Sequence, residues 1–171
     1  METIVNKVAE SGIVTLDLAP YIPDLNNFKS FDLKPFLFRE LILKEKDFRA
    51  SLVEYDWSQF ENKFVAITCT ADAIIPVWAY MLVASYLQPI AASVDFGSIE
   101  DTFNAKVREA ISAIDITEFS GKRVVVKGCG TIAIPDVAYV LMTAKLRPVV
   151  KSVMYGEPCS TVPIYKAPKT S

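Results

Sequence analysis

Two stretches of the chain share one pattern of apolar and polar positions. Residues 60–97 align without a gap with residues 119–156, and 13 of the 38 aligned pairs are identical. Many of the other pairs match one apolar residue with another. An internal repeat of this kind decides the architecture before any other feature does. The pattern therefore predicts a duplicated structural unit.

Each copy of the repeat predicts a β-α-β unit. A continuous, β-branched apolar run opens each copy, as in strands that are buried on both faces. A polar loop follows, and Pro76 or Pro135 then stands where the first helical turn begins, a position that favours proline. A second proline, Pro89 or Pro148, ends the helix. The predicted elements are strands at residues 64–68, 91–96, 123–127 and 149–155, with helices at residues 76–87 and 135–146.

The rest of the chain supplies further elements. Alternating apolar and polar residues predict a half-buried strand near the N-terminus, and apolar residues at helical spacing predict two helices. Proline and asparagine predict a loop before residue 31, and the stretch after it fits either a short helix or a strand. The first 12 residues are expected to be a short helix or a loose arm. These ranges are residues 13–18 for the strand, 44–56 and 99–114 for the helices, 19–30 for the loop and 32–43 for the ambiguous stretch.

The predicted fold class is α/β. Two tandem β-α-β repeats related by a pseudo-twofold axis would form a three-layer, mainly parallel sheet of order 2-1-3-4, to which the N-terminal strand and helix are added. A ferredoxin-like split of the repeats is the alternative. A chain of 171 residues suggests one domain. Its parts would be an N-terminal cover (1–58), repeat 1 (59–97), a linking helix (98–117), repeat 2 (118–156) and a C-terminal tail (157–171).

The composition narrows the class of protein. The chain is 51% hydrophobic and 22% charged, which is typical of an ordered globule. Because 18 Lys and Arg balance 20 Asp and Glu, we expect no nucleic acid and no membrane as partner. The N-terminal sequence has no signal-peptide pattern, so a cytoplasmic location with reduced thiols is expected. A homo-oligomer is left open.

Thiols form the first candidate site. Cys69 and Cys129 follow the first strands of the two repeats, Asp72 lies in the first of these loops, and Cys159 follows the last predicted strand. In the predicted sheet these residues share the carboxyl edge, where open α/β sheets bind ligands. They would suit iron, zinc or an iron–sulfur species. The alternative is that the cysteines fill space in the core, because no Cys-x-x-Cys motif is present.

A small-anion site is the second candidate. Lys127 ends a central strand, and Gly128 and Gly130 flank Cys129 in the next loop, where backbone N–H groups can approach a phosphate. The loop matches neither a dinucleotide-binding nor a P-loop motif, and Lys127 could instead pair with Asp72. The chain contains no histidine, which removes the Ser-His and Cys-His nucleophile pairs. No nucleophile–base pair can be drawn, so a non-enzymatic role is favoured.

Several segments resemble a bacterial family known as domain of unknown function 2480. The segments that carry the resemblance are residues 45–49, 56–58, 72–80, 127–129 and 155–166. No activity is established for that family, so the resemblance transfers no mechanism. It implies an accessory role near iron–sulfur cluster assembly, because genes of the family tend to lie beside genes of that pathway. Iron–sulfur assembly proteins would then be the partners.

Three functions follow from the sequence. The first is an accessory protein that holds a metal, sulfur or cluster species with Cys69, Cys129 and Cys159, together with Asp72. The second is a small-anion or nucleotide-binding module that uses Lys127 and the neighbouring N–H groups. The third is a non-catalytic interaction protein that docks through residues 157–166 of its C-terminal tail.

Overall fold

The chain divides into two compact units, each of which is described by itself. The computed structural model describes residues 12–128, 130–157 and 159–168. Unit 1 comprises Met1–Ile22 and Lys106–Ser171, and unit 2 comprises Pro23–Ala105. The prediction of a single domain with its five parts stays a prediction. The expected helix or arm at residues 1–12 lies, except for Gly12, outside the described residues.

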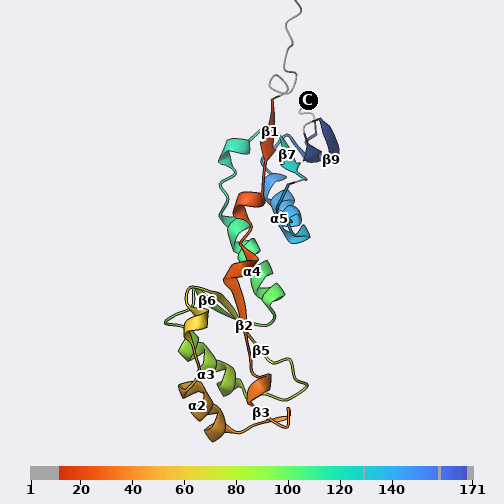
Figure 1. Ribbon diagram of the computed structural model, residues 1–171. Coiled ribbons are helices and arrows are strands. Elements are labelled where there is room, and N and C mark those ends of the chain that lie inside the picture. The colour runs from red at the N-terminus through yellow and green to blue at the C-terminus, as the bar shows by residue number, and fades with distance from the viewer. Residues whose placement is uncertain (1–11, 129, 158, 169–171) are drawn as a thin grey trace, which may run out of the picture. The chain divides into compact units, whose positions relative to one another are not determined.

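Unit 2 contains a three-stranded parallel sheet of order β2-β5-β6 (Figure 1). Helices α2 and α3 pack on one face of it, where Phe48 and Leu52 of α2 and Val83 of α3 are buried with Val65 of β5. A two-stranded antiparallel hairpin, β3 and β4, precedes α2. The bounds are β2 (Phe28–Asp32), β3 (Leu37–Phe38), β4 (Ile42–Leu43), α2 (Glu45–Val53), β5 (Phe64–Thr68), α3 (Val77–Leu87) and β6 (Ser93–Phe96).

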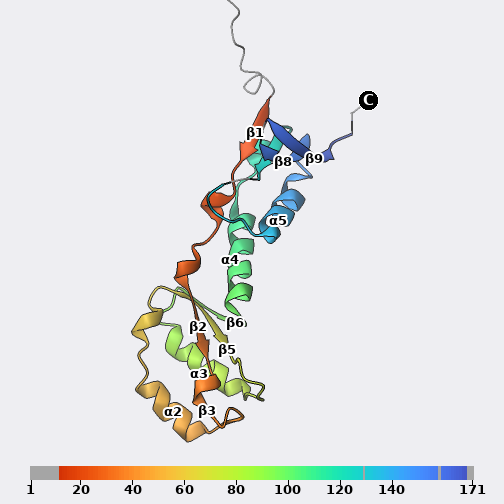
Figure 2. The ribbon, with the colours of Figure 1, turned by 45° about the vertical axis from the view of Figure 1, so that its right-hand side comes forward.

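Unit 1 contains a four-stranded sheet of order β1-β7-β8-β9 (Figure 2). β1, β7 and β8 are parallel, and β9 is antiparallel to β8. Helix α5 buries Ala138, Met142 and Leu146, and the interior of β7 is fully buried, as expected for a strand covered on both faces. The bounds are β1 (Ile13–Leu16), β7 (Arg123–Lys127), α5 (Asp136–Leu146), β8 (Ser152–Glu157) and β9 (Ser160–Lys166).

Helix α4 (Ile99–Ala113) follows β6 and contributes residues to both units. Ser98 caps its start: the Ser98 N–H donates to Asp101 Oδ2 at 2.9 Å, and the Asp101 N–H donates to Ser98 Oγ at 3.1 Å. This reciprocal pair is a capping box, which satisfies N–H groups at the helix start. No helix in the described part of the chain is both long and apolar enough to cross a membrane.

The structure confirms a mixed α/β fold with parallel sheets, but the predicted strand order is wrong. Each repeat forms a parallel β-α-β unit, β5-α3-β6 or β7-α5-β8. The prediction made β5 and β7 neighbours in one sheet, whereas β5 pairs with β2 and β7 pairs with β1, in two separate sheets. The physical reason is that two N-terminal strands occupy the edges that the prediction assigned to the other repeat. The single three-layer sheet is therefore not formed.

The two N-terminal strands are themselves a repeat. Residues 13–22 align with residues 28–37, and both contain Asp-Leu-x-Pro after an alternating run. Both strands end in a short 3-10 helix at the same position, Ala19–Tyr21 or Lys34–Phe36. The pairing registers also correspond, since β1 joins β7 and β2 joins β5 at equivalent residues of the 59-residue repeat. Each unit therefore holds one copy of a strand plus β-α-β module.

Two further segments differ from the predictions. The expected loop at residues 19–30 ends early, because Phe28 begins β2 and is buried there with Phe31. The expected C-terminal tail contains β9, which pairs with β8 along its length. β9 was missed because Pro163 is unusual in a strand interior. Proline is tolerated here on an edge strand, next to a register shift.

Candidate functional site

The carboxyl ends of β1 and β7 carry an ion pair. Their register places Leu16 beside Val126, so Asp17 and Lys127 follow at the same edge of the sheet. Lys127 Nζ donates to Asp17 Oδ2 at 3.0 Å, and the exposed side-chain fractions are 32% for Lys127 and 38% for Asp17. Asp17 Oδ1 accepts the N–H of Ala19 at 2.9 Å, which fixes the carboxylate. Lys127 thus pairs with Asp17, whereas Asp72 belongs to unit 2.

Two tyrosines complete this edge of unit 1. The Tyr139 hydroxyl donates to the carbonyl of Lys127 at 3.2 Å, and the Tyr155 hydroxyl donates to the carbonyl of Gly128 at 3.4 Å. Their rings are 5.4 Å apart and nearly perpendicular, the edge-to-face arrangement that aromatic pairs prefer. A Cβ atom on Gly128 would lie only 2.6 Å from Tyr155 Cζ. Glycine is therefore needed at this position for the ring to approach.

A cavity begins at these tyrosines and runs along α5. It has a volume of about 530 Å³ and is lined mainly by apolar atoms, with Tyr139, Val140, Tyr155, Ile164 and Arg147 among its walls. A mostly apolar cavity of this size with a few polar groups is typical of small-molecule sites. Unit 1 thus combines an ion pair and two hydroxyls with a neighbouring apolar cavity.

The corresponding edge of unit 2 carries different chemistry. Asp32 ends β2, where its Oδ1 accepts the N–H groups of Lys34 and Thr70 and its Oδ2 accepts the hydroxyl of Thr70. Cys69 follows β5 and is half-buried, with Sγ 3.8 Å from the carbonyl oxygen of Ala71. A hydroxyl and a thiol therefore stand where unit 1 has a lysine and a glycine.

Both edge aspartates are held in the charged form. The Ala19 N–H and then the Lys127 ammonium lower the pKa of Asp17 below its usual value. Burial opposes the charge on Asp32, but hydrogen bonds from Thr70 and Lys34 outweigh it, so this pKa is also lowered. Each edge therefore keeps a carboxylate at neutral pH.

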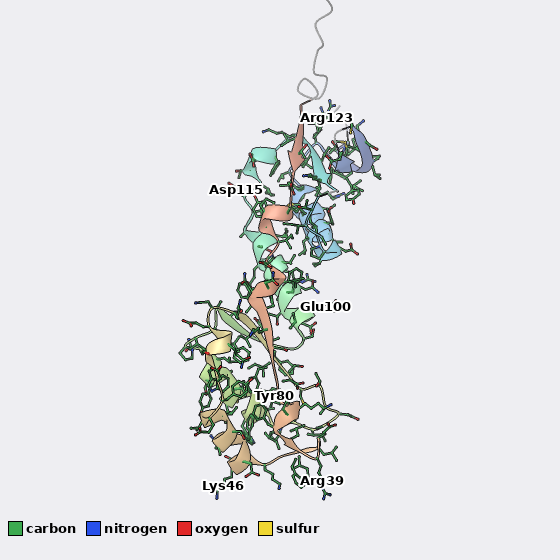
Figure 3. The ribbon with its side chains drawn as sticks, viewed as in Figure 1. Arg39, Lys46, Tyr80, Glu100, Asp115 and Arg123 are labelled. Carbon is green, nitrogen blue, oxygen red and sulfur yellow. The ribbon has the colours of Figure 1, made fainter. Side chains whose placement is uncertain are left out.

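Tyr80 of α3 lies near the edge of unit 2 (Figure 3). Burial raises the pKa of its hydroxyl, and the nearby Cys69 and Asp32 raise it further. The ring packs edge-to-face on Phe96 at 5.1 Å, as Tyr139 packs on Tyr155 in unit 1. The hydroxyl of Tyr80 stays protonated and can donate a hydrogen bond.

The predicted thiol site stays a prediction. Cys69 and Asp72 belong to unit 2, whereas Cys159 belongs to unit 1, where it is an exposed free thiol between β8 and β9. Cys129 lies outside the described residues. Among the residues that are described, no three Cys, Asp or Glu side chains gather closely enough to hold a metal ion. Of the predicted anion-binding loop, Gly128 lies at the edge and Gly130 is exposed.

Sequence reasoning missed Asp17, Tyr139 and Tyr155 as members of the unit 1 edge. The aspartate is separated from Lys127 by 110 positions, and its pairing depends on β1 lying beside β7. The recurrence of Asp-Leu-x-Pro at Asp17 and Asp32 is the signal that could have found it. Tyr139 and Tyr80 are identical in the repeat but stand in apolar helices, where a core role was favoured.

Comparison with known proteins gives one family. The model of a family described as "Protein of unknown function (DUF2480)" matches residues 2–167. No curated protein and no solved structure matches the chain. The family match spans nearly all of the 171 residues, in agreement with the resemblance drawn from the sequence. The chain therefore belongs to the DUF2480 family.

Proposed function

We propose that unit 1 is a small-anion-binding module whose site is the carboxyl edge of β7. The ammonium group of Lys127 would attract the anion, and the N–H groups around Gly128 and Gly130 would hold it. The single observation that carries the proposal is the Lys127–Asp17 pair, partly exposed at 3.0 Å. It stands at the edge where parallel sheets bind ligands.

The neighbouring cavity supports a ligand with an apolar body. Its walls include the rings of Tyr139 and Tyr155, which also donate hydrogen bonds to the backbone of this edge. An anion with an aromatic or aliphatic part would place its charge at Lys127 and its apolar part against these rings. Phenyl phosphate should therefore bind more tightly than inorganic phosphate.

Isothermal titration calorimetry of the full chain with phenyl phosphate tests the proposal. Lys127→Met should weaken binding about tenfold, because it removes a charge-assisted hydrogen bond. Lys122→Met is the matched control, since Lys122 is an exposed lysine that precedes the amino end of the same strand. Asp17→Asn should tighten binding severalfold by removing the competing carboxylate. Equal affinity in the wild type and Lys127→Met would refute this function.

The second candidate is an accessory thiol- or metal-binding function associated with iron–sulfur cluster assembly. It is favoured by the half-buried Cys69 at the carboxyl edge of β5, near Asp32 and Tyr80. Metal analysis of anaerobically purified protein, with single Ser replacements of Cys69, Cys129 and Cys159, tests it. A metal content that is substoichiometric and insensitive to all three replacements would exclude it.

Docking through a C-terminal tail needs a different experiment from a deletion. Residues 160–166 form β9, so removing the tail would also remove a strand of the sheet. Val162 and Ile164 are exposed on β9, and replacing each by Asp tests docking with the strand in place. Undiminished capture of iron–sulfur assembly proteins by both variants would oppose this function.

A further inference from the structure

Three cationic side chains meet at the amino end of the unit 1 sheet. The registers align Arg123 of β7 with Ser152 of β8, and Ser152 with Lys166 of β9. Aligned residues of neighbouring strands project from the same face, so these side chains form one row across three strands. With strands about 4.8 Å apart, the two cations at its ends are about 10 Å apart at the backbone.

A third cation, Lys151, joins this row from the turn before β8. Its N–H donates to the carbonyl of Lys122 at 2.7 Å, and its own carbonyl accepts the N–H of Ala167 at 2.8 Å. The backbone of Lys151 is therefore tied to the segments on both sides. This rigidity fixes where the flexible lysine side chain begins.

The row opens into a cavity of about 880 Å³. Arg123, Lys151 and Lys166 line it together with Ser152, and no Asp or Glu is found among its described lining residues. The remaining wall is largely apolar, and it includes Val149 and Met154. Its volume lies within the range of small-molecule sites.

The charges of this cavity are not matched by the protein. In the part of the chain that the structure describes, the salt bridges involve Lys34, Arg49, Lys106 and Lys127, and none involves Arg123, Lys151 or Lys166. Gathering like charges in one cavity costs free energy that a bound anion would offset. Figure 3 labels Arg123 at the start of β7 in unit 1.

We propose that this cavity binds the phosphate groups of a small molecule that carries a diphosphate. Arg123 and Lys166 would each contact one end of the diphosphate, the Ser152 hydroxyl would donate between them, and Lys151 would add a third positive charge. Arginine and lysine are the usual phosphate ligands, and a row of about 10 Å suits two phosphate groups better than one. The apolar wall leaves room for an organic part beyond the phosphates.

This site is distinct from the carboxyl edge proposed above. Arg123 and Lys127 are the first and last residues of β7, so their backbones are about 13 Å apart. The two sites use different cations of one strand. Variants at one end of β7 therefore test one proposal without testing the other.

Calorimetric titration of the full chain with pyrophosphate and with ADP at low salt tests the inference. Arg123→Gln and Lys151→Gln should each weaken binding about tenfold, and Ser152→Ala about threefold without any change of charge. Lys122→Gln is the control, because it removes a neighbouring charge that does not line the cavity. Circular dichroism should be unchanged, since Arg123 and Lys151 are exposed.

Three results would overturn the inference. The first is no measurable binding of either probe at millimolar concentration. The second is an equal loss for Lys122→Gln and Arg123→Gln, which would indicate diffuse attraction without a positioned site. The third is a loss of ADP binding in Lys127→Met alone, which would place the anion at the carboxyl edge.

Discussion

Replacing Gly128 by Ala tests the geometry of the unit 1 edge directly. The new Cβ atom would lie 2.6 Å from Tyr155 Cζ and 2.9 Å from its hydroxyl oxygen, distances that real Cβ atoms essentially never show. The backbone of Gly128 has no positive φ, so alanine itself is allowed there. The ring of Tyr155, which is 40% exposed, must therefore swing away from the edge.

The cost of that movement follows from the contacts that it breaks. Losing the edge-to-face contact of Tyr155 with Tyr139 costs about 0.5–1.5 kcal/mol, and losing the 3.4 Å hydrogen bond to the Gly128 carbonyl costs about 0.5 kcal/mol. Alanine restricts the unfolded chain and returns about 0.4–1 kcal/mol. Gly128→Ala should therefore destabilise the wild type by about 0.5–1 kcal/mol.

Unit 2 shows what happens when a Cβ atom is present. Cys69 occupies the position equivalent to Gly128, and Phe96 occupies that of Tyr155 in the 59-residue repeat. Phe96 is 73% exposed, against 40% for Tyr155. The more exposed ring beside the larger residue agrees with the expected movement.

A double-mutant cycle with Tyr155→Ala, followed by urea unfolding, measures the coupling. Without the ring, Gly128→Ala should become stabilising by about 0.4–1 kcal/mol, so the sign of its effect reverses. The expected coupling energy is about 1–2 kcal/mol. Equal effects of Gly128→Ala in both backgrounds would show that the ring does not approach the glycine, and the described edge would then be wrong.

Three further changes have defined outcomes. Gly156→Ala should cost about 2 kcal/mol or more in urea unfolding, because φ is +121° and the Cβ would lie 2.5 Å from the Ser160 carbonyl oxygen; a cost below that of Gly121→Ala, which meets open space, would contradict this. Lys145→Met should lower the unfolding free energy by about 1–2 kcal/mol, since Nζ donates to three carbonyls at the end of α4; an unchanged value would refute the capping role. The pKa of Asp17 is lowered in the folded state, so its stabilisation is present above the unfolded value of 3.8 and is lost as pH falls through the lower folded value; Asp17→Asn should therefore be less stable than the wild type at pH 7, with the difference shrinking in acid, and a constant difference would contradict the shift.

The sequence predicted best where burial is complete. The strands at residues 64–68 and 123–127 have the bounds expected, because both are continuous apolar runs covered on both faces. The edge strand β2 was missed, because Lys29 and Ser30 interrupt its apolar pattern and only Phe28 and Phe31 are buried. Edge strands carry a weaker pattern because one side of them faces no further strand.

Strand order was beyond the 59-residue repeat alone. Symmetry between β5 and β7 made them natural neighbours, and nothing in that repeat indicates that each has a partner near the N-terminus. The partners were nevertheless marked by a second repeat, in which Asp-Leu-x-Pro recurs after 15 residues. The pairing of Lys127 with Asp17 could be inferred only from both repeats together, since the shorter one supplies the strand that carries the aspartate.

The two copies of the module keep their geometry and differ in their chemistry. Asp17 and Asp32 each accept an N–H from the residue two positions later, so the carboxylate at the edge belongs to the shared fold. The groups that meet it differ, since one is the Lys127 ammonium and the other is the Thr70 hydroxyl. A conserved frame with exchanged partners is what divergence of two binding edges would produce. The anion and thiol proposals therefore concern different units, and either can fail without the other.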